Sequence, residues 1–290
     1  MVAKMEIEAL YGLLPPPLVA LLASSTFASS VAELRVRRGK RASLSVYREG
    51  KIENISLPYA LNNEEMEGVL SAICGDSVYT HEESIKRGYI RMKNGCRVGV
   101  AGEAVSRKGR ILRLYSIGSL VFRLHRRIKG AADGLVSAFR AEGCAKSILV
   151  YGPPCCGKTT VLREFAREIS RGKGALRTVL ADARGEFGEF EEECLLDILD
   201  GYPLGEGAEI ALRTLSPEVL ILDEIGKEEA EALAYAVGGG VPIVASAHAS
   251  SYEELLMREG VSSLLREGAF PLLYPLSSGE RIGVKEARGV

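Results

Sequence analysis

The residues from Gly152 to Thr159 read Gly-Pro-Pro-Cys-Cys-Gly-Lys-Thr and fit the pattern G-x-x-x-x-G-K-[ST] at every fixed position. An apolar run, 147–151, precedes this stretch, and a helical pattern from Lys158 to about Ser170 follows it. Strand, glycine loop and helix together make a phosphate cradle, because backbone N–H groups converge on one concavity and the helix N-terminus adds partial positive charge. The stretch therefore predicts a nucleoside triphosphate site.

Each residue type in this loop has an expected task. The lysine of such a loop reaches the β- and γ-phosphates of ATP, and the hydroxyl that follows it ligates Mg²⁺, so we assign these roles to Lys158 and Thr159. The residues expected to contact the nucleotide are those of the loop and the first helical turn: Gly152, Pro153, Pro154, Cys155, Cys156, Gly157, Lys158, Thr159 and Thr160. The chain has 6 cysteines and no C-x-x-C pair, which indicates reduced thiols rather than a disulfide framework.

Polar residues also follow three later apolar runs. The run 219–222 ends in Asp223 and Glu224, and parallel α/β sheets bind ligands at the carboxyl ends of their strands. Asp223 is expected to hold Mg²⁺ and Glu224 to polarise the attacking water, with the two side chains on opposite faces of the strand. The run 242–247 ends in His248, which either contacts the γ-phosphate or is an ordinary surface histidine. The run 177–181 ends in Asp182-Ala-Arg184, which points to the same rim.

These residues need a sheet to position them, and the sequence predicts one. Candidate strands 147–151, 177–181, 219–222 and 242–245 alternate with helical stretches, which favours an α/β fold with a parallel sheet, and 270–276 and 281–284 are expected to form a closing hairpin. Upstream, 33–57 alternates with period two, a helix follows Asn62, a hairpin turns at Asn94-Gly95, and a strand covers 119–125. We expect an α+β domain over 1–130 and a nucleotide-binding domain over 131–290, with a connecting helix at 131–142.

Composition excludes some functions. The net charge of −1 provides no overall polycation for nucleic acid or anionic lipid. No apolar run reaches the roughly 18 residues that span a bilayer, so we expect no direct membrane insertion and a soluble, cytoplasmic protein. A short amphipathic helix is expected after Pro15-Pro16-Pro17.

Charge is unevenly distributed, however. Between Ala104 and Gly130 the sequence has no acidic residue and a set of basic ones: Arg107, Lys108, Arg110, Arg113, Arg123, Arg126, Arg127 and Lys129. This stretch is a solvated face, a nucleic-acid stripe or a surface for an acidic neighbour. Residues 182–200 are conversely rich in Asp and Glu. We therefore predict that the two charged regions meet between subunits of a ring.

Several stretches beyond the phosphate loop resemble the stage III sporulation protein AA family, and together they cover both domains. They are Gly152 to Thr160, Asp200-Gly-Tyr-Pro203, Leu212 to Val219, Asp223-Glu-Ile-Gly226, Ala247-His248, Gly88-Tyr89 and Arg97 to Gly102. That family is similar to the type II and type IV secretion ATPases. The resemblance implies a RecA-like P-loop ATPase domain, a smaller N-terminal domain and a hexameric ring. It also implies a role in powering or assembling a channel between mother cell and forespore, together with membrane proteins of that channel.

The resemblance also implies roles for single residues. It makes Asp223 and Glu224 the Walker B pair and His248 the histidine-box residue, and it implies that an arginine near the end of the N-terminal domain contacts nucleotide. Arg123 fits that place best. The alternative is that Arg123 is one more solvated basic residue of the basic stretch. The sequence departs from the family at Ala183, where an acidic residue is usual, and at Leu204, where a lysine is frequent. Ala183 puts a water-orienting acid at that position in doubt.

Three functions stay open on the sequence. The first is an ATP-hydrolysing motor or assembly subunit of a secretion-like channel. The second is a scaffold that assembles on binding ATP with negligible turnover, which Ala183 keeps open. The third is a RecA-like ATPase that depends on nucleic acid, which the mild acidity and the scarcity of aromatic residues count against.

Overall fold

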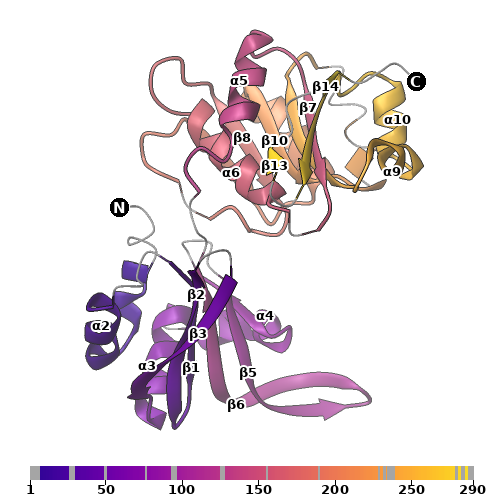
Figure 1. The fold of residues 1–290 in the computed structure, drawn as a ribbon. Helices are drawn as coiled ribbons and strands as arrows, with labels where there is room; N and C mark the ends of the chain where they lie inside the picture. The colour runs from indigo at the N-terminus through magenta and orange to yellow at the C-terminus, as the bar shows by residue number, and fades with distance from the viewer. Residues whose placement is uncertain are drawn as a thin grey trace. The chain divides into compact units, whose positions relative to one another are not determined.

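A computed structural model describes residues 7–25, 30–48, 51–75, 77–92, 97–124, 128–154, 156–188, 190–227, 229–230, 233, 239–277, 280–281 and 285–286. The chain divides into two compact units, Met1–Arg127 and Ile128–Val290 (Figure 1). Each unit has its own core of buried aliphatic and aromatic side chains. Among the described residues, every helix is too short or too polar to cross a bilayer.

The first unit is an α+β domain. In chain order its elements are η1 (Tyr11–Leu13), α2 (Pro16–Ala23), β1 (Val31–Arg37), β2 (Lys40–Arg48), β3 (Lys51–Ala60), α3 (Asn63–Cys74), η2 (Val78–His81), α4 (Glu82–Lys86), β4 (Tyr89–Arg91), β5 (Arg97–Arg107) and β6 (Arg110–Arg123). The strands form one antiparallel sheet in the order β3-β2-β1-β6-β5-β4. The period-two strands expected from the sequence are therefore present, and β4 and β5 pair as expected, while the Asn94-Gly95 turn lies outside the described residues.

Helix α3 begins where the sequence predicted. The Asn62 side chain accepts the Glu65 N–H, and the Glu65 carboxylate accepts the Asn62 N–H, both at 2.9 Å. This capping box satisfies two backbone donors that a helix start otherwise leaves open. The apolar face of α3, with Met66 and Val69, packs into the core with Leu34 of β1 and Leu18 of α2.

The hairpin of β5 and β6 is longer than the sequence predicted. Instead of a strand over 119–125, β6 runs from Arg110 to Arg123, and it pairs with β5 as far as the two-residue turn at Lys108 and Gly109. Both turn residues have positive φ, 51° and 74°, as the favoured hairpin turns require. The outer half of this ribbon is exposed on both faces, so it lacks the buried alternation from which strands are predicted.

The second unit is an α/β domain. Its elements are α5 (Asp133–Ala141), β7 (Ile148–Gly152), α6 (Lys158–Ile169), β8 (Thr178–Asp182), β9 (Leu196–Asp200), α7 (Leu204–Ile210), the π-helix η3 (Ala211–Leu215), β10 (Val219–Glu224), β11 (Ile243–His248), α9 (Tyr252–Met257), α10 (Val261–Arg266), β12 (Leu272–Ser277), β13 (Glu280–Arg281) and β14 (Lys285–Glu286). The sheet order is β13-β12-β7-β11-β10-β8-β9, with β14 on β12.

The centre of this sheet is parallel, as predicted. Strands β12, β7, β11, β10, β8 and β9 all run the same way, so their carboxyl ends meet at one edge. Helices α5 and α6 cover one face, where Phe139 and Phe165 pack edge to face at 5.3 Å, and α7, α9 and α10 cover the other. The sheet is thus buried on both sides, which explains the continuous apolar runs of its strands.

Two features of this sheet were not predicted. Strand β9 was not expected, because its sequence Leu-Asp-Ile-Leu-Asp carries acids and Leu199 is its one buried residue. Strand β12 was expected only as an arm of a closing hairpin. It does pair antiparallel with β13 and β14, but it also extends the parallel sheet by pairing with β7.

Candidate nucleotide site

The loop between β7 and α6 depends on two of its glycines. Gly157 has φ +99°, a conformation that side chains strain, and it leads directly into α6. A Cβ on Gly152 would lie 2.5 Å from the Leu276 carbonyl oxygen and 2.6 Å from Cys156 Sγ. The loop therefore fits tightly against β12. It ends at the N-terminus of the 12-residue helix α6. Cys155 lies outside the described residues.

Lys158 is buried in this loop, with 6% of its surface exposed. Its ammonium donates to the carbonyl oxygens of Gly152 and Pro153, each at 2.9 Å, and its Nζ lies 2.7 Å from Nδ1 of His248. An ammonium only donates, so Nδ1 accepts and a neutral His248 carries its hydrogen on Nε2. That Nε2 lies 3.2 Å from Oε1 of Glu224. His248 thus connects the lysine of the loop with the acid of β10.

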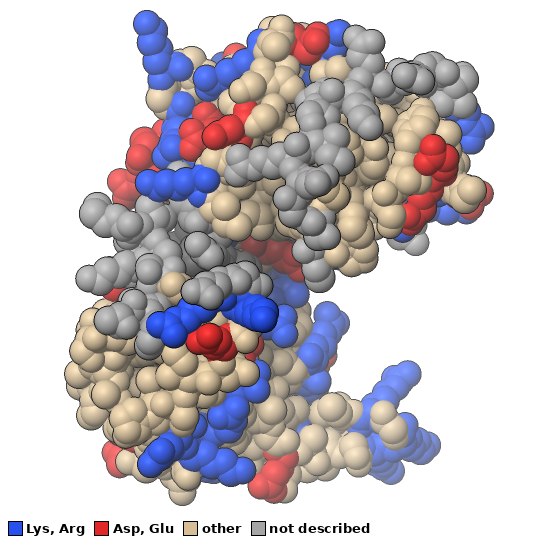
Figure 2. Space-filling view, viewed as in Figure 1, with Lys and Arg blue, Asp and Glu red and all other residues tan. Residues whose placement is uncertain are grey.

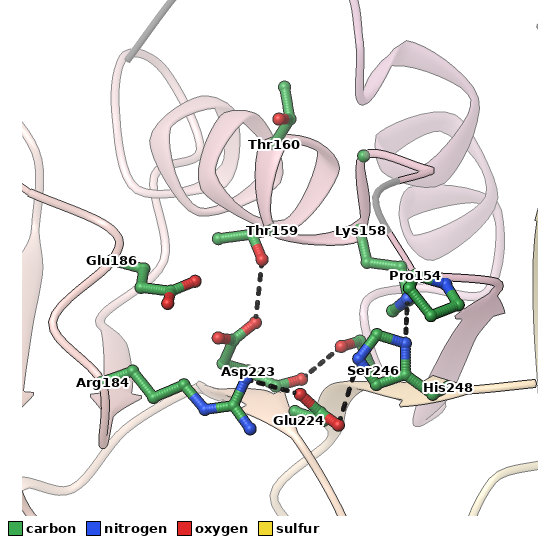
Figure 3. Close-up of a pocket in the computed structure, with 11 residues that line it drawn as sticks. Pro154, Lys158, Thr159, Thr160, Arg184, Glu186, Asp223, Glu224, Ser246 and His248 are labelled. Atoms are coloured by element: carbon green, nitrogen blue, oxygen red, sulfur yellow. Dashed lines mark hydrogen bonds and ion pairs between the residues drawn. The ribbon is translucent and has the colours of Figure 1, made fainter. Parts of the chain in front are cut away.

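The two acids of β10 lie side by side in the pocket because the strand bulges. Leu222 pairs with Ala245 and Glu224 with Ser246, so Asp223 has no partner residue on β11. The Ser246 hydroxyl donates to the Asp223 carbonyl oxygen at 2.5 Å and satisfies the displaced backbone. A bulge re-aims side chains, so these two acids need not follow the strict alternation of a regular strand. Both line one pocket, with Asp223 toward Thr159 and Glu224 toward His248 (Figure 3).

The pocket brings together residues from four segments of the chain. It encloses about 420 Å³ and is lined by Pro154, Gly157, Lys158, Thr159, Thr160, Arg184, Glu186, Asp223, Glu224, Ser246 and His248. The lining includes the predicted Pro154, Gly157, Lys158, Thr159, Thr160, Asp223, Glu224 and His248. The predicted Gly152, Pro153 and Cys156 are not among the lining residues. The tips of β8, β10 and β11 meet the start of α6 here, at the carboxyl edge of the sheet.

Asp223 and Thr159 offer oxygen ligands for a cation. The Thr159 hydroxyl lies 3.3 Å from Oδ1 of Asp223. Burial, and after it the charges of Glu186 and Asp182, raise the pKa of the Asp223 carboxyl to about 7, against the opposing Thr159 hydrogen bond and Arg184. Among the described residues, no three His, Cys, Asp or Glu side chains converge as ligands. The Thr159 hydroxyl and the Asp223 carboxylate fit Mg²⁺, because this ion keeps water and phosphate ligands and uses one or two protein oxygens.

The loop after β8 contributes more residues to the pocket than the sequence predicts. Asp182 is buried and accepts the N–H groups of Glu186 and Phe187 at 2.9 and 3.0 Å, which folds the loop back onto the pocket. Arg184 and Glu186 line the pocket, and Arg184 Nη1 lies 2.8 Å from Oε2 of Glu224. Ala183 is exposed and is not among the residues that line the pocket.

Arg123 belongs to the first unit, whereas the pocket is lined by residues of the second. It is exposed at the end of β6, between the buried Phe122 and Leu124, so its backbone is anchored and its side chain points outward, as expected. Arg213, on η3, is exposed, pairs with Glu209 at 2.8 Å and does not line the pocket.

Known proteins resemble this chain in sequence and in fold. Residues 6–287 match the family described as sporulation stage III, protein AA. Stage III sporulation protein AA of Bacillus subtilis (strain 168) is 34% identical over 266 residues, which is 87% of this chain and 84% of that protein.

Solved structures of an ATPase and of a pilus retraction motor share the fold. The ATPase DotB of Legionella pneumophila has a TM-score of 0.55 at 18% identity, covering 90% of this chain and 76% of its own. The pilus retraction motor PilT, solved with bound ADP, has a TM-score of 0.56 at 12% identity, covering 88% and 79%. At such identities the likeness shows a RecA-like P-loop fold. With the family match over nearly its whole length, the chain belongs to the stage III sporulation protein AA family.

Proposed function

We propose that this chain is a Mg²⁺-dependent ATPase. The observation that supports it most is the convergence of Lys158, Thr159, Asp223 and Glu224 on one pocket at the N-terminus of α6. A helix N-terminus, a lysine and a cation site attract the phosphates of a nucleotide, and an acid beside them can act on water. The fold shared with the ATPase DotB and with the ADP-bound motor PilT supports the proposal.

The residues divide the work by position. Lys158 leaves part of its contacts with the loop carbonyls and His248 to bind the β- and γ-phosphates. Thr159 and Asp223 hold Mg²⁺, which supplies positive charge to the phosphate oxygens. Glu224 accepts the proton of the attacking water, and His248, which contacts both Lys158 and Glu224, senses the γ-phosphate. Glu186 lines the same pocket and lies near Asp223. It can supply the acid that the chain lacks at Ala183.

In the cell we propose a motor or assembly subunit. It would form a ring of identical subunits, a hexamer, in the mother-cell cytoplasm, and act on membrane proteins of the channel to the forespore. The family membership and the secretion-ATPase fold support this role. The runner-up is a scaffold that binds ATP and assembles with negligible turnover. In its favour, protein partners engage both Lys158 and Glu224.

Calorimetry with MgATP tests the division of labour. Lys158→Ala removes the ammonium on the phosphates and should abolish binding, whereas Glu224→Gln keeps the shape of the acid and should leave ATP bound without hydrolysis. Lys173→Ala, an exposed lysine after α6, is the control for loss of charge alone. Equal loss of ATP affinity in the Lys158 and Glu224 variants would refute the assigned roles.

A further inference from the structure

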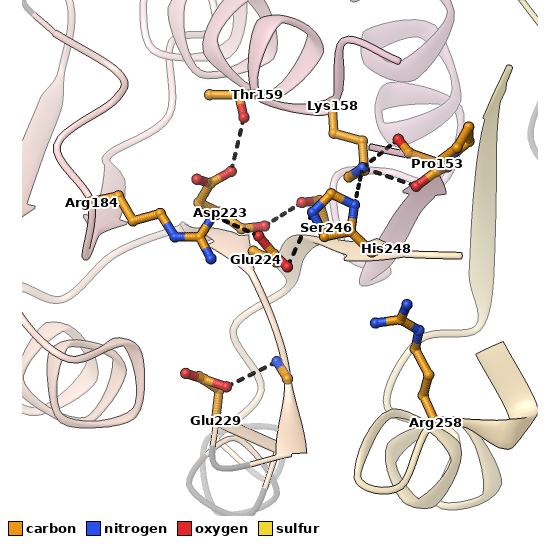
Figure 4. Close-up of polar contacts among 12 residues, drawn as sticks. Pro153, Lys158, Thr159, Arg184, Asp223, Glu224, Glu229, Ser246, His248 and Arg258 are labelled. Carbon is orange, nitrogen blue, oxygen red and sulfur yellow. Dashed lines mark hydrogen bonds and ion pairs between the residues drawn. The ribbon is translucent and has the colours of Figure 1, made fainter. Parts of the chain in front are cut away.

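Arg184 places a second cation in the pocket, on the side away from the lysine. Figure 4 shows Asp223 and Glu224 between Arg184 on one side and Lys158 with His248 on the other. The Arg184 side chain is 56% exposed and its Nη1 lies 2.8 Å from Oε2 of Glu224. Lys158 and Arg184 are the cationic side chains among the described residues that line the pocket, against the acids Glu186, Asp223 and Glu224.

The loop that carries Arg184 is fixed at both ends. Asp182, at the end of β8, is 2% exposed and accepts the N–H groups of Glu186 and Phe187. Phe187 is fully buried in the core beneath α6. Gly185 has φ +61° and makes the turn between these anchors. Arg184 is thus held at the rim by a short, hydrogen-bonded loop of the same unit as Lys158.

Lys158 and Arg184 differ in the number and arrangement of their N–H donors. Lys158 has three N–H groups, and its partners include the carbonyls of Gly152 and Pro153 and His248 Nδ1. The planar guanidinium of Arg184 has five N–H donors in a fixed fork. It can therefore hold Glu224 with one N–H and a phosphate oxygen with another. An arginine is suited to bind a phosphate because its N–H donors form a fixed fork and because it always keeps its charge.

We propose that Arg184 is a catalytic residue that binds the terminal phosphate in the pocket of its own subunit while it holds Glu224. This inference rests on the proposed ATPase function and deepens it. In the reaction, the water oxygen bonds to the γ-phosphorus, the bond from that phosphorus to the bridging oxygen breaks, and its electron pair leaves with ADP. The water proton passes to Glu224 and from there to the released phosphate. Arg184 balances the charge on the γ-phosphate oxygens and distinguishes ATP from ADP.

A narrower role would leave Arg184 as a positioning residue that only orients Glu224. The two roles separate in a Glu224→Gln background, where no carboxylate remains to be oriented. We expect Arg184→Ala in that background to weaken binding of a non-hydrolysable ATP analogue with Mg²⁺ by about ten- to a hundredfold, the worth of a charged hydrogen bond. Binding of ADP should stay unchanged. Isothermal calorimetry of both ligands measures the ratio.

Two further variants serve as controls. Arg177→Ala removes an arginine just before β8, at the opposite end of that strand from Arg184, where it pairs with Glu218 at 3.4 Å, and it should leave both affinities unchanged. Arg184→Lys keeps the charge without the fork and should recover only part of the selectivity for ATP. Unchanged affinities in Arg184→Ala, or equal loss for ATP analogue and ADP, would overturn the proposal. If the parent chain itself bound neither nucleotide, the proposed function would fall first.

Mixing subunits tests whether Arg184 acts within its own pocket. Arg184→Ala and Glu224→Gln chains, each inactive, should stay inactive when mixed, because no pocket then contains both groups. Recovery of ATP turnover in the mixture would show that Arg184 acts on a neighbouring subunit and would overturn the proposed geometry. The binding measurement above needs no turnover, so it tests whether Arg184 contacts the terminal phosphate even if the chain is a scaffold that does not hydrolyse ATP.

Discussion

Asp223 has a role in the proposed function that lowers the stability of the folded protein, because a cation ligand must be ionised while its carboxyl is buried. Its carboxyl is 5% exposed and lies among other acids, and burial raises its pKa to about 7. The folded, nucleotide-free protein therefore holds this proton more tightly than the unfolded chain does. Stability falls as the pH rises from about 4 to about 7, and above that range the loss is constant. A cation bound to the carboxylate would offset this loss, which is how a metal site can be destabilising while it is empty.

Asp223→Asn should consequently stabilise the nucleotide-free protein. The neutral amide removes the unfavourable ionisation, and the gain should grow between about pH 4 and about pH 7 to roughly 1–4 kcal/mol. Urea unfolding at about pH 5 and about pH 8, without nucleotide or Mg²⁺, measures it. Asp197→Asn, an exposed acid of β9, is the control and should show no such trend. A gain in the Asp223 variant that is the same at both pH values would contradict the account.

At the scale of elements, the sequence was informative where a local rule determines the structure. The glycine loop, the Asn62 cap and the apolar runs of β7, β8, β10 and β11 each follow from a spacing that only one local structure satisfies. The bulge at Asp223 could not be predicted, because it arises from the pairing of β10 with β11 and the Ser246 hydroxyl. The outer part of β6 was missed because neither of its faces is buried. Arg184 was noticed as a polar tip, but its contact with Glu224 depends on how the loop after β8 folds.

Strand β6 carries the prediction about Arg123. Buried Phe122 and Leu124 fix the strand and leave the arginine between them exposed. We predict that this arginine contacts a nucleotide across a domain or subunit boundary. Arg123→Ala should keep ATP affinity and lose turnover by about 10³–10⁵. Mixed with Glu224→Gln chains it should regain activity, because a mixed ring can pair an intact Glu224 with a neighbour's Arg123. This recovery distinguishes Arg123 from Arg184, for which none is expected.

Parental turnover in Arg123→Ala would move the role to another arginine. Arg97 is the next candidate, although its guanidinium lies 5.2 Å from the Tyr89 ring centroid and already has a packing role. Arg126 lies outside the described residues. Lost turnover without recovery on mixing would place the contact within one subunit.

At the scale of the whole molecule, two charged surfaces suggest how subunits meet. Arg107, Lys108, Arg110 and Arg113 gather at the outer end of the β5–β6 hairpin, where Figure 2 shows a blue cluster, and Ile111 and Leu112 are exposed among them. The basic stretch of the sequence is therefore not one stripe, since Arg123 lies at the other end of β6. The acidic region divides too: Asp182, Glu186 and Glu191 serve the second unit internally, which leaves an exposed set of Glu192, Glu193, Asp197 and Asp200 on and beside β9.

Strand β9 ends the sheet order of the described strands, with Leu195 and Ile198 exposed. We therefore predict that the hairpin end of one subunit meets the β9 edge of the next. Reversing Arg107, Lys108 and Arg110 to Glu should weaken assembly, more so at low salt, where repulsion between like charges is least screened. Reversing Glu192, Glu193 and Asp197 to Lys should do the same. Sedimentation across a salt series measures both.

Mixing the two reversed chains gives the sharper result. One chain then has two acidic surfaces and the other two basic ones, so they can assemble only in alternation. Recovery of the particle in the mixture, and not in either chain alone, would establish the contact. Unchanged sedimentation of the hairpin variant would leave that end of the hairpin a solvated surface.

The central claim is that this pocket hydrolyses ATP, and the rate of phosphate release by the purified chain tests it most directly. The account predicts steady release with ATP and Mg²⁺, none when EDTA removes the metal, and a rate at least about 100-fold lower in Glu224→Gln, which still binds ATP. The measurement should be made at a protein concentration where sedimentation shows the assembled particle. A parent chain that assembles with ATP bound but releases no more phosphate than Glu224→Gln would contradict the claim and favour the scaffold.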